Sequence, residues 1–215
     1  MPKTTSRLFT LWFAPLLAAI LLLAGCGEKG GDANQMLLSP VKSSFKNTDV
    51  TGLGYARDFS LTDHNGKLRR LEDFRGKAVL MFFGYTQCPD VCPTTMSEMA
   101  EVMKQLGPDA ERLQVLFVTV DPERDTAAVL RNYVPGFDPR FLGMTGDIAA
   151  LDKVAKEFRV FYQKVPGKQP GSYTMDHTAG SYVFDAKGRI RLFVRHGQGA
   201  EPIAHDIKQL LASGG

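Results

Sequence analysis

The stretch AVLMFFGYTQCPDVCPTT, residues 78–95, joins an unbroken apolar run to two closely spaced cysteines. The apolar run over residues 78–85 predicts a central strand that is buried on both faces of a sheet. Cys88 and Cys92 follow, each directly before a proline. A helical pattern begins at about Thr94. This order places both thiols at the carboxyl end of a sheet strand, where α/β folds bind their ligands.

Outward from this stretch, predicted strands alternate with predicted helices, which favours an α/β fold around a mixed sheet. Residues 57–77 predict two strands joined by a tight turn at Asn65-Gly66. Residues 113–120 predict a second buried strand, and residues 181–194 predict two strands joined at Lys187-Gly188. Helices are predicted over residues 94–107, 124–134, 146–158 and 201–211.

The helix over residues 94–107 carries Met96, Met99 and Met103 at helical spacing. Methionines are candidate copper ligands, but a stripe at this spacing beside a sheet is more typical of the core. We therefore predict that they pack against the sheet.

The N-terminal residues are typical of a secretion signal. Lys3 and Arg7 precede an apolar run over residues 8–24, and small residues lead to Cys26. The stretch LAGC resembles a bacterial lipobox, which implies removal of residues 1–25 and lipidation of Cys26. The alternative is an uncleaved membrane anchor. In either case the domain is expected to be tethered on the extracytoplasmic, periplasmic side.

Residues 26–54 are rich in Gly, Asn, Asp, Ser and Lys, which predicts a flexible membrane tether before a folded domain over residues 55–215. The chain is 44% hydrophobic and 23% charged, as is normal for a globular protein. It has 26 basic and 23 acidic residues, and removal of residues 1–25 would take away two basic ones, leaving 24 against 23. A balance so close to neutral gives no case for nucleic-acid binding.

Cys88 and Cys92 remain as a pair if Cys26 carries a lipid. Because a helix N-terminus favours negative charge, we expect both thiols to ionise easily. Their helical spacing of about 5–6 Å between Cβ atoms exceeds the roughly 3.8 Å of a disulfide, but Pro89 and Pro93 argue against a regular helix through both. The spacing therefore allows either a disulfide or a two-thiolate clamp for a soft ion such as Cu(I).

A histidine would complete such a metal site, and the chain has four. His64 falls in the predicted hairpin turn, His196 at a strand end and His205 on the last helix, where structural or solvated roles are expected. His177, in YTMDHTAGSYVFD, is predicted in a loop that can lie beside the cysteine loop. The residues alone leave two alternatives for His177, a metal ligand or a capped loop histidine.

Four stretches together resemble the Sco/SenC family: GYTQCPDVCPTTM, VTVDPERDT, FLGMTG and YTMDHTAGSYVFD. The resemblance runs from about residue 59 to the C-terminus. It implies a thioredoxin-like fold with a central mixed sheet, flanking helices and an N-terminal hairpin. It also implies that Cys88, Cys92 and His177 bind copper, as Cu(I) or, with a further oxygen ligand, as Cu(II). The expected role is assembly of the dinuclear copper centre of cytochrome c oxidase, with the copper-bearing oxidase subunit as partner.

Three aspartates near these motifs are candidates for supporting roles. Asp90, between the cysteines, is either an Asx-turn residue that accepts backbone N–H bonds or an ordinary turn residue. Asp121 ends a predicted strand and is a candidate for ordering a loop or contacting a partner. Asp176 is a candidate for orienting His177.

Three functions compete for the cysteine pair. The first is a copper metallochaperone, not an enzyme, that transfers its metal by thiolate ligand exchange. The second is a thiol–disulfide oxidoreductase in which Cys88 and Cys92 reduce the cysteines of the oxidase copper subunit. A peroxidase of the peroxiredoxin type is disfavoured because no arginine lies near the cysteines in the motif. Other copper chaperones and thioredoxin-like reductants are further expected partners.

Overall fold

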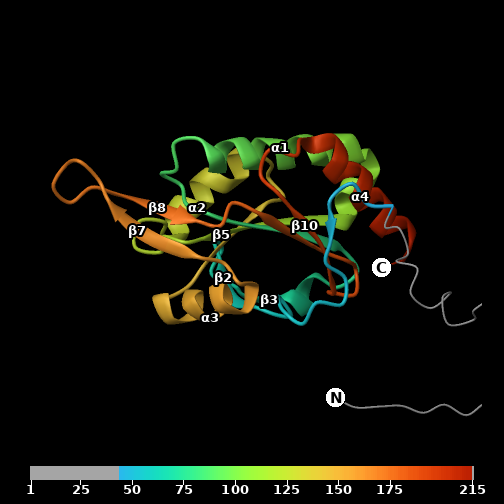
Figure 1. The fold of residues 1–215 in the computed structure, drawn as a ribbon, viewed down its shortest axis with the longest axis horizontal. Helices are drawn as coiled ribbons and strands as arrows, with labels where there is room; N and C mark the ends of the chain where they lie inside the picture. The colour runs from blue at the N-terminus through green and yellow to red at the C-terminus, as the bar shows by residue number, and fades with distance from the viewer. Residues whose placement is uncertain (1–43, 215) are drawn as a thin grey trace, which may run out of the picture. The chain divides into compact units, whose positions relative to one another are not determined.

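The computed structural model describes residues 44–214 (Figure 1). The predicted signal peptide, Cys26 and the tether up to residue 43 lie outside the described residues. The main sheet contains, in spatial order, β1 (Thr48–Asp49), β10 (Ile190–Val194), β9 (Ser181–Phe184), β4 (Ala78–Gly84), β5 (Leu113–Thr119), β6 (Leu142–Thr145), β2 (Ser60–Asp63) and β3 (Leu68–Arg70). A separate two-stranded sheet consists of β7 (Tyr162–Pro166) and β8 (Tyr173–His177).

The strand at the centre of this sheet is β4, as the apolar run predicts. All seven of its residues are buried. It pairs in parallel with β5 and antiparallel with β9, so the sheet is mixed, as predicted. The β2–β3 pair is the predicted N-terminal hairpin. Its turn contains Gly66 at φ 87°, a left-handed conformation that glycine adopts without strain.

Helices cover both faces of the sheet. They are α1 (Val91–Leu106), α2 (Ala127–Tyr133), α3 (Ile148–Phe158) and α4 (Ala200–Ala212), with short 3-10 helices η1 (Leu71–Phe74), η2 (Gly107–Arg112) and η3 (Val134–Gly136). Figure 1 shows α1 and α4 together on one face and α3 on the other. Asp147 is the N-cap residue of α3 and accepts a hydrogen bond from the Ala150 amide at 2.7 Å.

The methionines of α1 are core residues, which confirms the prediction. Met96, Met99 and Met103 are buried in the same hydrophobic core as the residues of β4 and β5, on a helix that also packs against α4. Within the described part of the chain, no helix combines the length and the apolar character that a membrane span needs.

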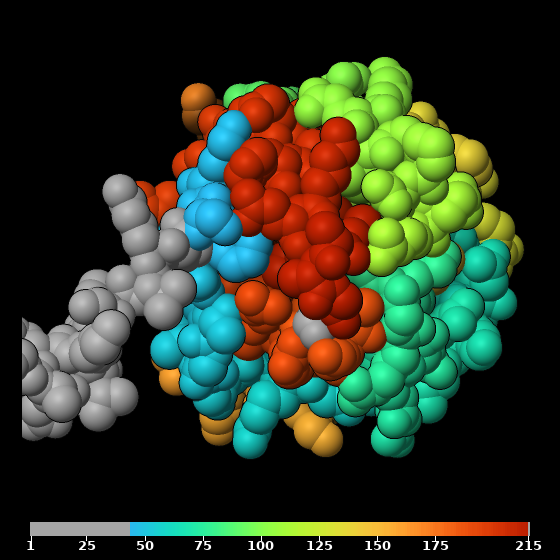
Figure 2. Space-filling model, turned by 90° about the vertical axis from the view of Figure 1, so that its right-hand side faces the viewer, coloured from blue at the N-terminus to red at the C-terminus, as the bar shows by residue number. Residues whose placement is uncertain are grey.

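The structure corrects the end of the predicted tether, because residues 44–50 pack against the domain. The β1 strand pairs with β10. Just before it, the Lys46 amide donates to Asp206 Oδ1 at 2.9 Å, and the Asn47 amide donates to Asp206 Oδ2 at 2.8 Å. Figure 2 shows this N-terminal segment in blue against the red α4 helix. The sequence did not predict this contact because the segment is polar and because its partner, Asp206, lies about 160 residues away along the chain.

Asp206 is fully buried on α4, and its carboxylate accepts the hydrogen bonds of the Lys46 and Asn47 amides. Burial alone would raise its pKa, but hydrogen bonds from the Lys46 amide, His205 and Asn47 outweigh burial and lower the pKa. Because the pKa of the folded state lies below the unfolded value of about 3.9, the stabilisation is complete above that pH. It is lost as the pH falls through the folded-state pKa.

Asp206→Asn is therefore expected to lower the unfolding free energy by about 1–3 kcal/mol at pH 7. Urea denaturation at pH 7 and at about pH 3.5 should show this deficit shrinking in acid. Asp109→Asn is the control, because Asp109 forms only an exposed ion pair with Arg112. An equal deficit for Asp206→Asn at both pH values would contradict the carboxylate clamp.

Candidate metal centre

The two cysteines lie where β4 gives way to α1, as predicted. Cys88 belongs to the connection, and Cys92 is the second residue of α1, so no regular helix passes through both. Both are free thiols in this structure. Cys92 is fully buried, whereas Cys88 is half-buried. The Cys92 amide donates a hydrogen bond to Cys88 Sγ at 3.4 Å.

His177 reaches this pair from the second half of the chain. It is the last residue of β8, so the prediction that it lies in a loop is wrong. Its Nε2 lies 3.6 Å from Cys92 Sγ, and its Nδ1 lies 3.0 Å from the Thr178 carbonyl oxygen. A carbonyl only accepts hydrogen bonds, so this contact assigns the proton to Nδ1 and leaves a lone pair on Nε2. Burial lowers the pKa of His177, which favours the neutral ring.

Aromatic side chains and a glycine enclose the imidazole and the Cys92 thiol. The rings of Phe82 and Tyr85 meet the imidazole edge to face, with centroids 6.1 and 6.0 Å away. A Cβ on Gly84 would lie 2.9 Å from Cys92 Sγ, so the missing side chain at this position makes room for the thiol. The two donor atoms therefore meet in a mostly apolar environment.

This environment overturns the expectation that the Cys92 thiol ionises easily. Burial raises the pKa of the Cys92 thiol far above its ordinary value. The N-terminus of α1 does not compensate for the lost hydration. Without a metal, Cys92 is therefore a protonated thiol that can donate to His177 Nε2.

The three candidate aspartates behave differently from one another. Asp90 occupies the N-cap position of α1, but its side chain caps no backbone N–H and instead accepts from the Thr94 hydroxyl at 3.4 Å. Asp176 is exposed. The Nδ1 atom of His177 contacts the Thr178 carbonyl oxygen, where we expected the Asp176 carboxylate. Of the two alternatives for Asp90, the structure therefore supports the ordinary turn residue, whereas the expected contact of Asp176 with His177 is not found. Asp121 is buried just after β5 and forms an ion pair with Arg124.

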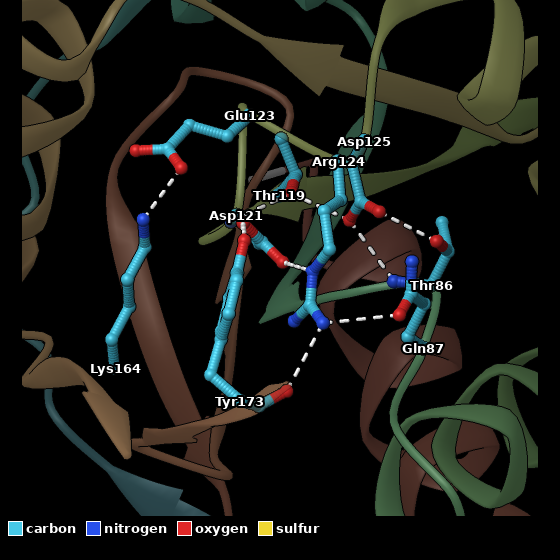
Figure 3. Close-up of polar contacts among 9 residues, drawn as sticks. All are labelled: Thr86, Gln87, Thr119, Asp121, Glu123, Arg124, Asp125, Lys164 and Tyr173. Carbon is cyan, nitrogen blue, oxygen red and sulfur yellow. Dashed lines mark hydrogen bonds and ion pairs between the residues drawn. The ribbon is translucent and has the colours of Figure 1, made fainter. Parts of the chain in front are cut away.

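Sequence reasoning missed Asp125, although it belongs to the quoted VTVDPERDT stretch. Asp125 is fully buried and accepts from the Thr86 amide at 2.9 Å, from the Thr86 hydroxyl at 2.5 Å and from the Thr119 hydroxyl at 2.7 Å (Figure 3). Burial raises the pKa of its carboxyl group. Because Thr86 lies two residues before Cys88, Asp125 anchors the segment that carries the cysteines.

The other three histidines have structural partners elsewhere, as expected. His64 Nδ1 accepts from the Gly143 amide at 3.0 Å. His196 Nδ1 lies 3.1 Å from the Thr95 hydroxyl. His205 Nδ1 lies 2.9 Å from Asp206 Oδ1.

Cys88, Cys92 and His177 thus converge on one place, although not as a ready-made site. Within residues 44–214, no three His, Cys, Asp or Glu side chains already have an arrangement that could hold a metal ion. Cys92 and His177 are in contact, whereas Cys88 Sγ faces the Cys92 amide. A shared ion would require an adjustment of the half-buried Cys88 side chain.

A family model described as SCO1/SenC matches residues 49–212. The chain belongs to the SCO1/SenC family. Relatives of this SCO1/SenC protein include the mitochondrial SCO2 homologues of Bos taurus and Homo sapiens, which are 39% and 36% identical to it over 158 residues. These alignments cover 73% of the chain but only 59% of each mitochondrial protein.

Solved structures of the family share its fold. Copper-bound ScoI of Bradyrhizobium japonicum is 46% identical, with a TM-score of 0.66, and the match covers 71% of this chain and 97% of ScoI. Apo Sco1 of Thermus thermophilus is 38% identical, with a TM-score of 0.70, covering 80% and 99% of the two chains. Copper-bound yeast Sco1 is 30% identical, with a TM-score of 0.66, covering 73% and 87%. These matches confirm the predicted thioredoxin-like α/β fold of the SCO1/SenC protein.

Proposed function

We propose that this protein binds copper through Cys88, Cys92 and His177 and delivers it to the dinuclear copper centre of cytochrome c oxidase. The observation that carries the proposal is the 3.6 Å separation of Cys92 Sγ and His177 Nε2. One ion held by both atoms at about 2.3 and 2.0 Å, at trigonal angles, would place them about 3.7 Å apart. The spacing therefore suits a shared metal ion as well as a hydrogen bond.

The chemistry of the donors favours Cu(I). Thiolates select soft ions, and a neutral imidazole with a free Nε2 lone pair is a suitable further ligand. Copper is also named in the bound forms of two relatives, ScoI of Bradyrhizobium japonicum and yeast Sco1. Copper is the cargo in this proposal, and the copper-bearing oxidase subunit is the recipient.

The unequal burial of the two sulfurs suits transfer. Cys92 lies in the interior, whereas Cys88 is half-buried in the connection before α1. An incoming thiolate from the recipient can therefore approach the ion from the Cys88 side while Cys92 and His177 still hold it. Lipidation of Cys26 would keep the domain at the periplasmic face of the membrane, and this part of the proposal concerns residues outside those described.

A thiol–disulfide oxidoreductase remains the alternative. It is favoured by the hydrogen bond from the Cys92 amide to the half-buried Cys88 sulfur, since such a donor also stabilises an attacking thiolate. This function would need both cysteines but would not need a free Nε2 on His177.

His177→Ala separates the two functions. We expect it to lower Cu(I) affinity about a hundredfold, equivalent to about 2.7 kcal/mol, because one of three donors is lost. The rate at which the thiols react with a small disulfide reagent should stay within about twofold, because both sulfurs remain. Cu(I) affinity can be measured by competition with a chelating dye, using the full-length chain.

The matched control is His196→Ala, which removes a histidine that contacts Thr95 rather than the cysteines. Wild type and this control should each bind one Cu(I). Equal copper affinities for His177→Ala and wild type would refute the ligand role of His177. A wild-type protein that binds no copper but reduces disulfides would replace the chaperone with the alternative.

A further inference from the structure

The hairpin that carries His177 cannot be held in place by its own strands alone. The β7–β8 sheet is not hydrogen-bonded to the main sheet, and Figure 1 shows it projecting from the domain. Met175 is the only buried residue in its two strands. Because an isolated two-stranded hairpin is only marginally stable in water, the position of His177 depends on contacts outside the hairpin.

Arg124 makes one such contact, from the segment between β5 and α2. Its Nη1 donates to Gln87 Oε1 at 3.0 Å and to the Tyr173 carbonyl oxygen at 3.0 Å (Figure 3). Gln87 directly precedes Cys88, and Tyr173 begins the strand that ends at His177. One guanidinium nitrogen therefore bridges the cysteine segment and the histidine strand.

The same guanidinium also holds the Tyr173 side chain. It lies 3.6 Å from the centroid of the Tyr173 ring, a distance at which the cation and the aromatic face attract each other. The Tyr173 hydroxyl donates to Asp121 Oδ1 at 2.9 Å, and Asp121 forms an ion pair with Arg124 Nε. Tyr173 is thus bound through its carbonyl, its ring and its hydroxyl. The Arg124 guanidinium contacts the Tyr173 carbonyl and ring and pairs with Asp121 at the same time, which requires a planar group with several fixed donors.

We infer that Arg124 is a positioning residue that couples the segment before Cys88 to the hairpin and thereby holds the His177 imidazole at the Cys92 sulfur. The coupling itself follows from the contacts of Arg124 and can be tested without metal. Its consequence for copper rests on the proposed function. Asp121, predicted as a supporting residue, acts in this arrangement by fixing Arg124 and Tyr173 against each other.

The structure offers a control contact that joins the segment of Arg124 to the same hairpin without reaching the cysteine segment. Lys164 on β7 forms an ion pair of 2.6 Å with Glu123, the neighbour of Arg124, and its Nζ lies 4.8 Å from the centroid of the Tyr173 ring. Both side chains are about half exposed, at 43% and 52%. Exposed pairs of this kind contribute little because water and salt screen them. Lys164→Gln should therefore leave the hairpin in place.

The first experiment is hydrogen–deuterium exchange on the metal-free full-length chain. Arg124→Gln and Arg124→Lys are expected to speed exchange of the β7–β8 amides about tenfold, equivalent to about 1.4 kcal/mol. Arg124→Lys is the informative variant because it keeps a positive charge beside the buried Asp121. Its ammonium cannot replace the guanidinium fork between Gln87 and Tyr173. Lys164→Gln should change the same rates by less than about twofold.

The second experiment is a double-mutant cycle on Cu(I) affinity. Arg124→Lys should lower affinity about tenfold in the wild-type background and leave it unchanged within about twofold when His177→Ala is already present. An equal loss in both backgrounds would show general structural damage and would overturn the positioning role.

The two measurements separate the inference from the proposed function. If wild type binds no copper while Arg124→Lys still loosens the hairpin, the function fails and the coupling stands. If wild type binds copper while Arg124→Lys changes neither hairpin exchange nor affinity, the function stands and the inference is wrong.

Discussion

Serine in place of Cys92 is expected to lower Cu(I) affinity at least about a thousandfold, equivalent to about 4 kcal/mol. Cys92 is the buried member of the pair and lies in contact with His177 Nε2. A serine hydroxyl stays protonated and is a hard oxygen donor, so it cannot replace a thiolate for a soft ion. Cys88→Ser should cause a loss of similar size, because Cys88 supplies the other sulfur. Competition titration with a chelating dye measures both affinities.

The control for these variants is Met99→Leu. Met99 is a buried sulfur-containing residue two turns further along α1, and the structure assigns it to the core. This swap nearly conserves volume and should leave Cu(I) affinity within about twofold. Tight copper binding by Cys92→Ser, or a large loss in Met99→Leu, would mean that the metal binds elsewhere.

Asp125→Ala is expected to have the largest effect on folding, a loss of about 3–5 kcal/mol of unfolding free energy. The side chain is fully buried and accepts three hydrogen bonds from Thr86 and Thr119. Removing it would leave buried donors without partners and a small cavity between β5 and the cysteine segment. Urea denaturation of the full-length chain measures the loss.

Two further variants should lose less unfolding free energy than Asp125→Ala. Asp125→Asn keeps the shape and one acceptor oxygen, so it should lose about half as much stability. Glu123→Gln lies in the same segment but on the surface, and it should stay within about 0.5 kcal/mol of wild type. A stability loss below about 1 kcal/mol for Asp125→Ala would contradict the anchoring role of Asp125.

Local sequence patterns predicted the framework of the fold and the identity of the candidate donors. The apolar run over residues 78–85, the turn glycines and the helical periodicities each describe short segments, and each element was found within a few residues of its expected place. The motif resemblance selected Cys88, Cys92 and His177, which the structure brings together. Copper binding by these residues stays a prediction.

The errors have more than one physical cause, and one of them is the meeting of segments that are distant in sequence. The tether was placed too far along the chain because Asp206 binds Lys46 and Asn47 across about 160 residues. The β7–β8 hairpin was missed because its two strands contain one buried residue, Met175, and lack a clear apolar pattern. Asp90 and Asp176 were named as candidates because they lie close in sequence to the cysteines and to His177, but Asp90 accepts from Thr94 and the Thr178 carbonyl contacts His177.

The sequence by itself determined a buried strand, a cysteine pair at a helix start and a set of possible ligands, because these depend on residue type and local spacing. Tertiary structure brought the candidate ligand His177 into contact with the Cys92 sulfur, 85 residues away in sequence. It also made Cys92 a protonated thiol, since burial removes the water that would stabilise the thiolate, and it placed Arg124 between the two halves of the site. The burial of Cys92 and the contacts of His177 and Arg124 depend on groups that are far apart in sequence. Those groups come into contact and exclude water only when the complete domain packs.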